Sequence, residues 1–320
     1  MINIIDKRKY SYIFSGVLVI TSITLLLVWG LKLGIDFKGG TLMEVQFSSN
    51  QALEETAENS EAENSEEFKA PTRDEIIEKL KDLNLESLNV QESENNSAVL
   101  RYIGSSEDVN EQVMEKLTEF DGSVEQTRVD FVGSSISKQL KRNAIMAVIL
   151  SVLGIALYIA WAFRKVSYPI PSWQYGIAAI VALAHDITIT LGIFVLLGKF
   201  MNVEVGVSFI AALLTILGYS VNDTIVVFDR IRENLIKSSK KEDFEKVVNK
   251  SINETLARSI NTSLTVMIVL VAIVLFGGES VKYFSVALLI GVIFGTYSSI
   301  FVASALLVTN YRREQKVKEN

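Results

Sequence analysis

Long uncharged stretches alternate along the chain with short polar segments, and their lengths predict helices that cross a membrane. Spanning the hydrocarbon core of a bilayer takes roughly 20 mostly apolar residues in a helix. Six stretches meet this requirement, at residues 12–31, 145–163, 176–197, 207–228, 260–276 and 284–308. The pattern therefore predicts a polytopic α-helical membrane protein with six transmembrane helices.

The distribution of basic residues predicts the orientation of these helices. Short loops rich in Lys and Arg stay on the cytoplasmic side of a membrane. Such loops fall on one side throughout, with Lys7, Arg8, Lys9, Arg164, Lys165, Arg230, Arg232, Lys237, Arg312 and Arg313. The opposite short loops carry little more than Lys199 and Lys282, so both termini are predicted to be cytoplasmic. The first span lacks a small-residue cleavage site and is interpreted as a retained anchor.

Residues 32–142, between the first two spans, are long enough for one small extracytoplasmic domain. Strand patterns occupy residues 41–47, 85–91, 98–103 and 124–132, and a helix that opens at Pro71 and a second at 109–117 lie between them. The order βαββαβ is that of a ferredoxin-like α+β domain. Residues 50–67 are acidic and almost free of large apolar side chains, which predicts a disordered insert.

The chain divides accordingly into a cytoplasmic N-terminus with the first span (1–31), the outer domain (32–142), a five-helix bundle (143–308) and a cytoplasmic tail (309–320). Within the bundle, a cytoplasmic loop at 229–258 carries apolar residues at helical spacing among Lys and Glu. These residues are Phe244, Val247, Val248, Ile252 and Leu256. A helix of this kind lies either on the membrane surface or against the bundle, and the pattern fits both.

Composition narrows the possible functions. With 49% hydrophobic and 21% charged residues and a mean hydropathy of +0.31, the chain is more apolar than one water-soluble core requires. It has no cysteine, one histidine (His185) and no GxxxxGKS/T phosphate loop. A net charge of −6 argues against binding to nucleic acid. We therefore expect no metal, no cofactor and no enzymatic activity.

Three ionisable groups lie in or at the edge of the predicted spans, where each costs at least ~2.5 to 3.5 kcal/mol. Asp223 is in the fourth span, Asp186 is in the third beside His185, and Arg258 is at the cytoplasmic start of the fifth. Burial favours a neutral Asp223 and a nearby guanidinium favours the ionised form, so a changing distance to Arg258 would switch its protonation. This chemistry suits a proton carrier, and a static ion pair between two helices fits the spacing equally well.

Neighbouring polar residues are placed to support these groups. They are Ser220, Asn222 and Thr224 near Asp223, and Thr262 and Thr265 on the face of the fifth helix that carries Arg258. Asp186 is a further candidate for a proton path, and the alternative is that its carboxyl accepts hydrogen bonds from Ser or Thr of a neighbouring helix. His185 has no evident second ligand for a metal. Gly291, Gly295 and Ser299 recur every four residues, which indicates close helix packing.

Two stretches carry a resemblance to a known family: residues 36–40 (DFKGG) and 218–234 (GYSVNDTIVVFDRIREN). The motif residues in them are Asp36, Gly39, Gly40, Gly218 and Tyr219. Residues 184–190 (AHDITIT) and 255–259 (TLARS) match at the expected places. Over nearly its whole length the chain resembles the SecF family of the resistance-nodulation-division (RND) superfamily.

The resemblance implies a bacterial inner-membrane subunit that pairs with SecD and assists the SecYEG channel, with YidC and YajC as further partners and the emerging polypeptide as substrate. In that family, proton flow through an intramembrane Asp and Arg drives late, ATP-independent steps of export. Carried over to this chain, the role falls on Asp223 and Arg258. Two alternatives remain: an RND-type exporter of drugs or lipids, which usually has twelve spans, and a scaffold of the translocon that moves no protons.

Overall fold

The computed structural model describes residues 2–48, 68–93, 96–103, 107–164, 170–237 and 243–319. Two compact units divide the chain: residues 1–32 with 144–320 form one, and residues 33–143 form the other. The acidic stretch at 50–67, expected to be disordered, lies outside the described residues.

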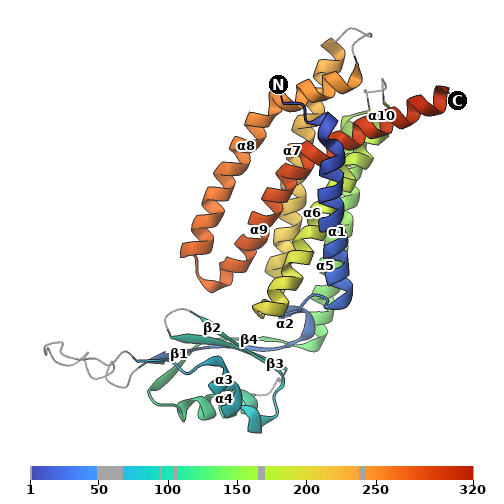
Figure 1. Cartoon of the computed structure of the whole chain (residues 1–320). Coiled ribbons are helices and arrows are strands. Elements are labelled where there is room, and N and C mark those ends of the chain that lie inside the picture. Colours follow the sequence, from blue (N-terminus) through green and yellow to red (C-terminus); the bar gives the residue numbers. More distant parts are fainter. Residues whose placement is uncertain are drawn as a thin grey trace, which may run out of the picture. The chain divides into compact units, whose positions relative to one another are not determined.

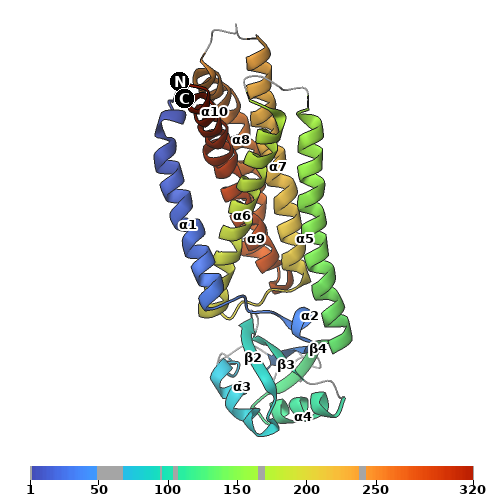
Figure 2. The same ribbon diagram turned by 90° about the vertical axis from the view of Figure 1, so that its right-hand side faces the viewer.

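The first unit is a bundle of long helices (Figures 1 and 2). In the described parts of the chain, six helices are long and apolar enough to cross a membrane, as the sequence predicts: Ile5–Val28, Ser134–Ala162, Ser172–Phe200, Val207–Lys237, Phe244–Phe276 and Val281–Val317. They correspond to α1 (Arg8–Val28, preceded by the short helix Ile5–Lys7), α5, α6, α7, α8 and a composite last span. That last span consists of α9 (Glu279–Ser298), a π-helical turn (Ser299–Ala303) and α10 (Ser304–Glu319). Both termini lie at the same end of this bundle (Figure 2).

Helices α6, α7 and α9 form the centre of the bundle. About half of the apolar window of α6, of α7 and of the last span is buried, against less than a fifth in α1, α5 and α8. Small residues allow this close packing, since a Cβ added to Gly291 of α9 would lie within 2.7 Å of Ile216 Cγ2 on α7. A Cβ on Gly295 would lie 3.0 Å from Ser220 Cβ. The predicted small-residue repeat is therefore a helix contact.

The segment predicted as a cytoplasmic amphipathic loop, 229–258, mostly belongs to the two long helices. Helix α7 continues to Lys237, and α8 begins at Phe244 with the Asp243 side chain accepting a hydrogen bond from the Glu245 backbone N–H. The apolar residues of this segment pack into the bundle core, and those that are buried are Phe244, Val247, Val248 and Ile252. Of the two arrangements that the pattern allowed, the structure has the helix against the bundle.

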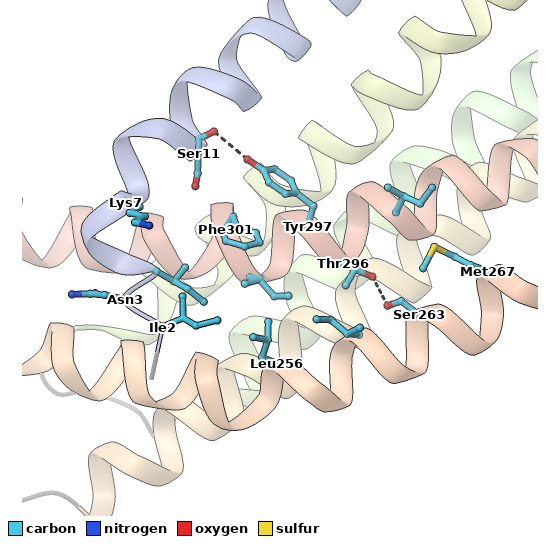
Figure 3. Close-up of a pocket in the computed structure, with 14 residues that line it drawn as sticks. Ile2, Asn3, Lys7, Ser11, Leu256, Ser263, Met267, Thr296, Tyr297 and Phe301 are labelled. Carbon is cyan, nitrogen blue, oxygen red and sulfur yellow. Dashed lines mark hydrogen bonds between the residues drawn. The ribbon is translucent and has the colours of Figure 1, made fainter.

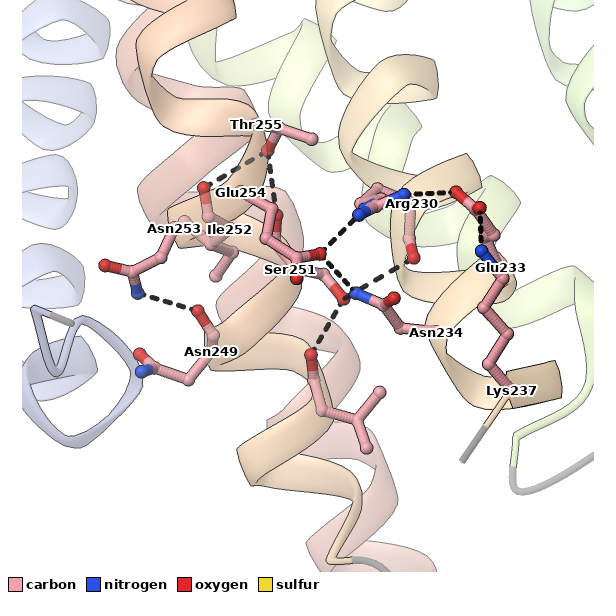
Figure 4. A network of polar contacts seen from close by, with 11 residues as sticks. Arg230, Glu233, Asn234, Lys237, Asn249, Ser251, Ile252, Asn253, Glu254 and Thr255 are labelled. Atoms are coloured by element: carbon pink, nitrogen blue, oxygen red, sulfur yellow. Dashed lines mark hydrogen bonds and ion pairs between the residues drawn. The ribbon is translucent and has the colours of Figure 1, made fainter. Parts of the chain in front are cut away.

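Polar contacts hold these helix extensions together (Figure 4). The Arg230 guanidinium of α7 donates from Nε to Glu254 of α8 at 2.7 Å. The Asn234 amide donates to the same carboxylate at 2.7 Å and to Ser251 Oγ at 2.9 Å. Because these contacts satisfy the polar groups that extend beyond the apolar runs, both helices are longer than hydropathy alone predicts.

The second unit is a four-stranded antiparallel sheet with two helices. Along the chain it runs β1 (Gly40–Ser48), α3 (Arg73–Lys79), β2 (Glu86–Ser93), β3 (Ser97–Ile103), α4 (Glu107–Thr118) and β4 (Ser123–Val132), after the short helix α2 (Ile35–Lys38). The spatial order β2-β3-β1-β4, with every neighbouring pair antiparallel, is that of a split βαβ fold. The predicted ferredoxin-like domain is confirmed.

Alternation along β1 explains the core of this domain. Met43, Val45 and Phe47 are buried on one face of the strand and pack with Ile76 of α3 and Val113 of α4. Helix α3 begins with a capping box, since Thr72 and Glu75 satisfy each other's backbone N–H groups. These capping hydrogen bonds therefore stabilise a helix that is only seven residues long.

Candidate functional site

Asp223 lies on α7 inside the helix bundle, with 8% of its surface exposed. Its two carboxyl oxygens accept hydrogen bonds from two other segments. Ser259 Oγ of α8 donates to Oδ1 at 2.6 Å, and Ser299 Oγ, at the start of the π-helical turn, donates to Oδ2 at 2.5 Å. Neutral hydroxyls thus hold a carboxyl where three segments of the bundle meet.

Arg258 does not pair with Asp223 in this structure. Its side chain is exposed on α8, and in the described residues it takes part in no ion pair. Adjacent positions on a helix point about 100° apart. Ser259 therefore faces the carboxyl, while Arg258, Thr262 and Thr265 lie on a face of α8 that the described residues leave exposed. The expected Asp223–Arg258 contact is absent from this conformation.

Among the residues that the structure describes, the four predicted to support Asp223 do not contact its carboxyl but have other surroundings. Ser220 Oγ donates to Asp186 Oδ2 at 2.6 Å, and Thr224 Oγ1 donates to the Ser220 carbonyl at 3.1 Å. Asn222 is exposed. Thr262 Oγ1 donates to the carbonyl of Arg258 at 2.9 Å. None of the four contacts the Asp223 carboxyl in the described part of the chain.

Asp186 is a second buried carboxyl, on α6, with no exposed surface. His185 Nδ1 lies 2.9 Å from its Oδ1, and Oδ2 accepts from Ser220 of α7 at 2.6 Å and from Ser298 of α9 at 2.8 Å. Hydrogen bonds from serines of neighbouring helices are the arrangement that the alternative interpretation of the sequence predicted. The structure thus places two carboxyls in the bundle, each held by hydroxyls from other segments.

Hydroxyl groups continue from the Asp223 site toward a cavity. Ser263, one turn after Ser259 on α8, lies 2.5 Å from Thr296 Oγ1 of α9 and accepts from Tyr219 of α7 at 3.1 Å. Ser263 and Thr296 line a mainly apolar cavity of about 430 Å³ among the N-terminal segment, α8 and α9 (Figure 3). A Cβ added to Gly218 would have no neighbouring atom within 4 Å, so close packing does not explain the glycine at this motif position.

The Gly39–Gly40 pair has a structural reason. Gly39 ends α2 with φ of 82°, and Gly40 opens β1 with φ of 129°. A Cβ on Gly40 would overlap the Tyr102 carbonyl of β3, and a Cβ on Gly39 would lie 3.2 Å from the Val132 carbonyl oxygen. Asp36 lies half-buried in α2 just before this turn. The motif therefore shapes the entry into the sheet.

Sequence reasoning missed three of the four serines that hold the two carboxyls, and it assigned the fourth, Ser220, to Asp223 whereas it donates to Asp186. Ser259 lies in the segment 255–259, which was interpreted only as a family motif, and Ser299 lies in the small-residue repeat of the last span, which was interpreted as helix packing. Ser298 carried no signal at all. Among the described residues, no group of three or more His, Cys, Asp and Glu side chains could hold a metal ion.

Comparison with known proteins places this architecture in a family. The family model "Protein export membrane protein SecD/SecF, C-terminal" matches residues 112–313, and "SecD/SecF GG Motif" matches residues 24–51. The chain is 40% identical over 317 residues to "Protein translocase subunit SecF" of Thermobaculum terrenum, covering 97% of this chain and 94% of the relative.

Longer proteins are similar over part of their length. The chain is 35% identical to "Protein translocase subunit SecDF" of Bacillus subtilis, covering 97% of this chain and 38% of that protein. The crystal structure of SecDF from Thermus thermophilus superposes with a TM-score of 0.80 at 30% identity. The superposition covers 96% of this chain and 38% of that chain. This multi-pass membrane protein belongs to the SecD/SecF family of protein translocase subunits.

Proposed function

We propose that the chain is the SecF-type subunit of the Sec export machinery and works with a separate SecD to drive late, ATP-independent stages of translocation through SecYEG by the proton motive force. One observation carries the proton-coupled part of this proposal. The Asp223 carboxyl is enclosed in the bundle, and its described hydrogen-bond partners are two serine hydroxyls.

The serine partners suit a carboxyl that changes protonation. A hydroxyl donates to an ionised carboxylate, and it also accepts a hydrogen bond from the protonated acid after rotating its own proton. The Ser259 and Ser299 contacts can therefore serve both states of Asp223. A fixed guanidinium would favour the ionised state alone.

Arg258 supplies the second half of the coupling in this proposal. Arg258 directly precedes Ser259 and points about 100° away from it around the helix, so a rotation of α8 would exchange the serine for the guanidinium at Asp223. Such an exchange would favour proton release, and the return would favour proton uptake. Each proton that crosses the membrane releases about 2.3 kcal/mol per 100 mV, which is enough to bias a two-state motion of helices.

The uncovered face of α8 supports a SecD partner. An exposed guanidinium at the edge of a spanning segment is costly where it meets lipid, and Arg258, Thr262 and Thr265 all lie on that face. We assign the face to SecD, because fused SecDF proteins contain the corresponding region in one chain with SecD. YidC and YajC are the further partners in this proposal.

The proposed location is the bacterial inner membrane, with both termini cytoplasmic and the ferredoxin-like domain on the outer side. The basic short loops support this orientation. The outer domain would then contact the emerging polypeptide.

Asp223→Asn tests the proposal in inner-membrane vesicles that carry the full chain with SecD and SecYEG. After ATP is exhausted, a partly translocated substrate is followed as the proton motive force is applied. Asp229→Asn is the matched control, because Asp229 is an exposed acid on the same helix, 3.4 Å from Arg232. We expect the forward movement to stop in Asp223→Asn and to persist in Asp229→Asn, with SecD still co-purifying. Full movement in Asp223→Asn would leave the scaffold as the better function.

A further inference from the structure

Asp186 is more fully enclosed than Asp223, and the proposed function does not use it. Its carboxyl is fully buried and has three close polar partners, His185 Nδ1 and the hydroxyls of Ser220 and Ser298. Burying an ionised carboxylate is costly unless donors compensate for the lost water. The three partners provide that compensation, and two of them are hydroxyls that also suit the protonated acid.

His185 has one ring nitrogen without a partner. The ring is 5% exposed, and its Nε2 finds no hydrogen-bond partner in the described parts of the protein. Tyr297 stacks against the ring at 6.1 Å between centroids, but the Tyr297 hydroxyl donates to the Ser11 carbonyl at 3.3 Å. When Nδ1–H donates to an ionised Asp186, Nε2 carries a free lone pair. Nε2 can therefore accept a proton.

Consecutive residues connect the two carboxyls. Ser298 ends α9 and donates to Asp186, and Ser299 begins the π-helical turn and donates to Asp223. The Ser304 hydroxyl bonds to the Ser299 carbonyl at 3.0 Å across five residues. Short π-helical insertions are frequent at functional sites, where they change the direction of neighbouring side chains. Because the two serines share one peptide bond, a shift of either donor moves the other.

We propose that His185 and Asp186 form a second proton-binding site, coupled to Asp223 through Ser298 and Ser299. A proton bound at Nε2 gives an imidazolium next to the carboxylate. Transfer of the Nδ1 proton to Asp186 Oδ1 then leaves a neutral imidazole and a neutral acid, so one proton has been taken up and none is lost. The neutral acid binds the Ser298 hydroxyl less strongly. The π-helical turn then shifts and displaces Ser299 relative to the Asp223 carboxyl.

Several other ionisable groups lie on the elements that pack against α6. They include Tyr297 of α9, Asp223 and Tyr219 of α7, Tyr12 of α1, and Glu314 of α10, which bonds to Gln174 about three turns away. Helix α1 contributes Ser15 and Ser22 as its buried polar residues. In the described residues, the groups in direct contact with the Asp186 carboxyl are therefore His185, Ser220 and Ser298.

Infrared difference spectra between acidic and alkaline pH test this inference, which rests on the proposed proton-coupled function. The sample is the full chain with its SecD partner in phospholipid vesicles. The carbonyl stretch of a protonated carboxyl is recorded for wild type, Asp186→Asn and Asp223→Asn. We expect two acid signals, one lost in each variant, and we expect Asp223→Asn to move the pH at which the Asp186 signal is half-formed.

A serine pair keeps the test decisive if Asp186→Asn fails to fold. Ser298→Ala removes one donor from Asp186, and a hydrogen bond to a charged group contributes about 1.5 to 3 kcal/mol, so the midpoint should move by about one pH unit or more. Ser285→Ala is the matched control, since Ser285 is buried on the same helix and its hydroxyl has no partner among the described atoms. The control should leave the midpoint unchanged.

The outcomes separate the two proposals. If the Asp223 signal is present and no signal depends on Asp186 or Ser298, the second site is refuted and the proposed function stands. If neither carboxyl changes protonation, both are refuted. If both titrate but Asp223→Asn leaves the Asp186 midpoint unchanged, the coupling through the serines is refuted.

Discussion

The Gly40 backbone offers a quantitative test of how the Gly39–Gly40 turn shapes the outer domain. In Gly40→Ala, the new Cβ would overlap the Tyr102 carbonyl and lie 3.2 Å from its carbon. The φ of 129° adds backbone strain, because side-chain-bearing residues rarely adopt it. Strain of about 1 to 3 kcal/mol and overpacking of similar size predict a loss of roughly 3 kcal/mol of local stability.

Hydrogen exchange measures this loss in the full chain. The backbone amides that pair β1 with β3 should exchange more than about a hundredfold faster in Gly40→Ala, since each 1.4 kcal/mol is a factor of ten. Gly133→Ala is the matched control, because Gly133 has an ordinary φ and its Cβ would make an ordinary contact 3.8 Å from Phe131. Equal exchange in Gly40→Ala and Gly133→Ala would refute the steric explanation of the motif.

Two further predictions concern the bundle and the sheet. Gly291→Ala would force a Cβ into Ile216, so overpacking by about 1 to 3 kcal/mol should lower the apparent Tm of the purified chain, whereas an unchanged Tm would contradict the contact. Burial raises the pKa of Tyr102 to about 12. Between pH 10 and 12 the unfolded chain therefore releases a proton that the folded domain keeps, and stability falls as the pH rises above about 10. The slope should be shallower in Tyr102→Phe, and an identical slope would contradict this assignment.

Hydropathy and alternation predicted most of the fold, because the environment of each element, either lipid or the boundary between water and a protein core, determines its pattern of apolar residues. All six spans were placed, and the four strands lie within two residues of their predicted ends. The helix ends beyond the apolar runs were missed, since Arg230 and Asn234 are held by a tertiary contact with Glu254 that no local pattern shows. Their polarity predicted a loop, whereas the contacts between α7 and α8 stabilise them as helix.

The candidate site was predicted in part. The two buried acids, Asp186 and Asp223, were identified because an ionisable group in a long apolar run requires an explanation. The hydroxyl partners of Asp223 were not identified, because the rotation of each helix about its axis decides whether Arg258 or Ser259 faces Asp223. A change of one residue position turns a side chain by about 100°, and hydropathy in a helix surrounded by lipid and protein does not fix that angle.

Proton uptake into vesicles measures directly whether the Asp223 carboxyl carries protons across the membrane. The full chain and its SecD partner are reconstituted into liposomes that contain a pH-sensitive dye, and a membrane potential is imposed. We expect proton uptake by wild type and by Asp229→Asn, and none above the protein-free background by Asp223→Asn. Uptake in Asp223→Asn at the wild-type rate would show that the buried carboxyl carries no protons.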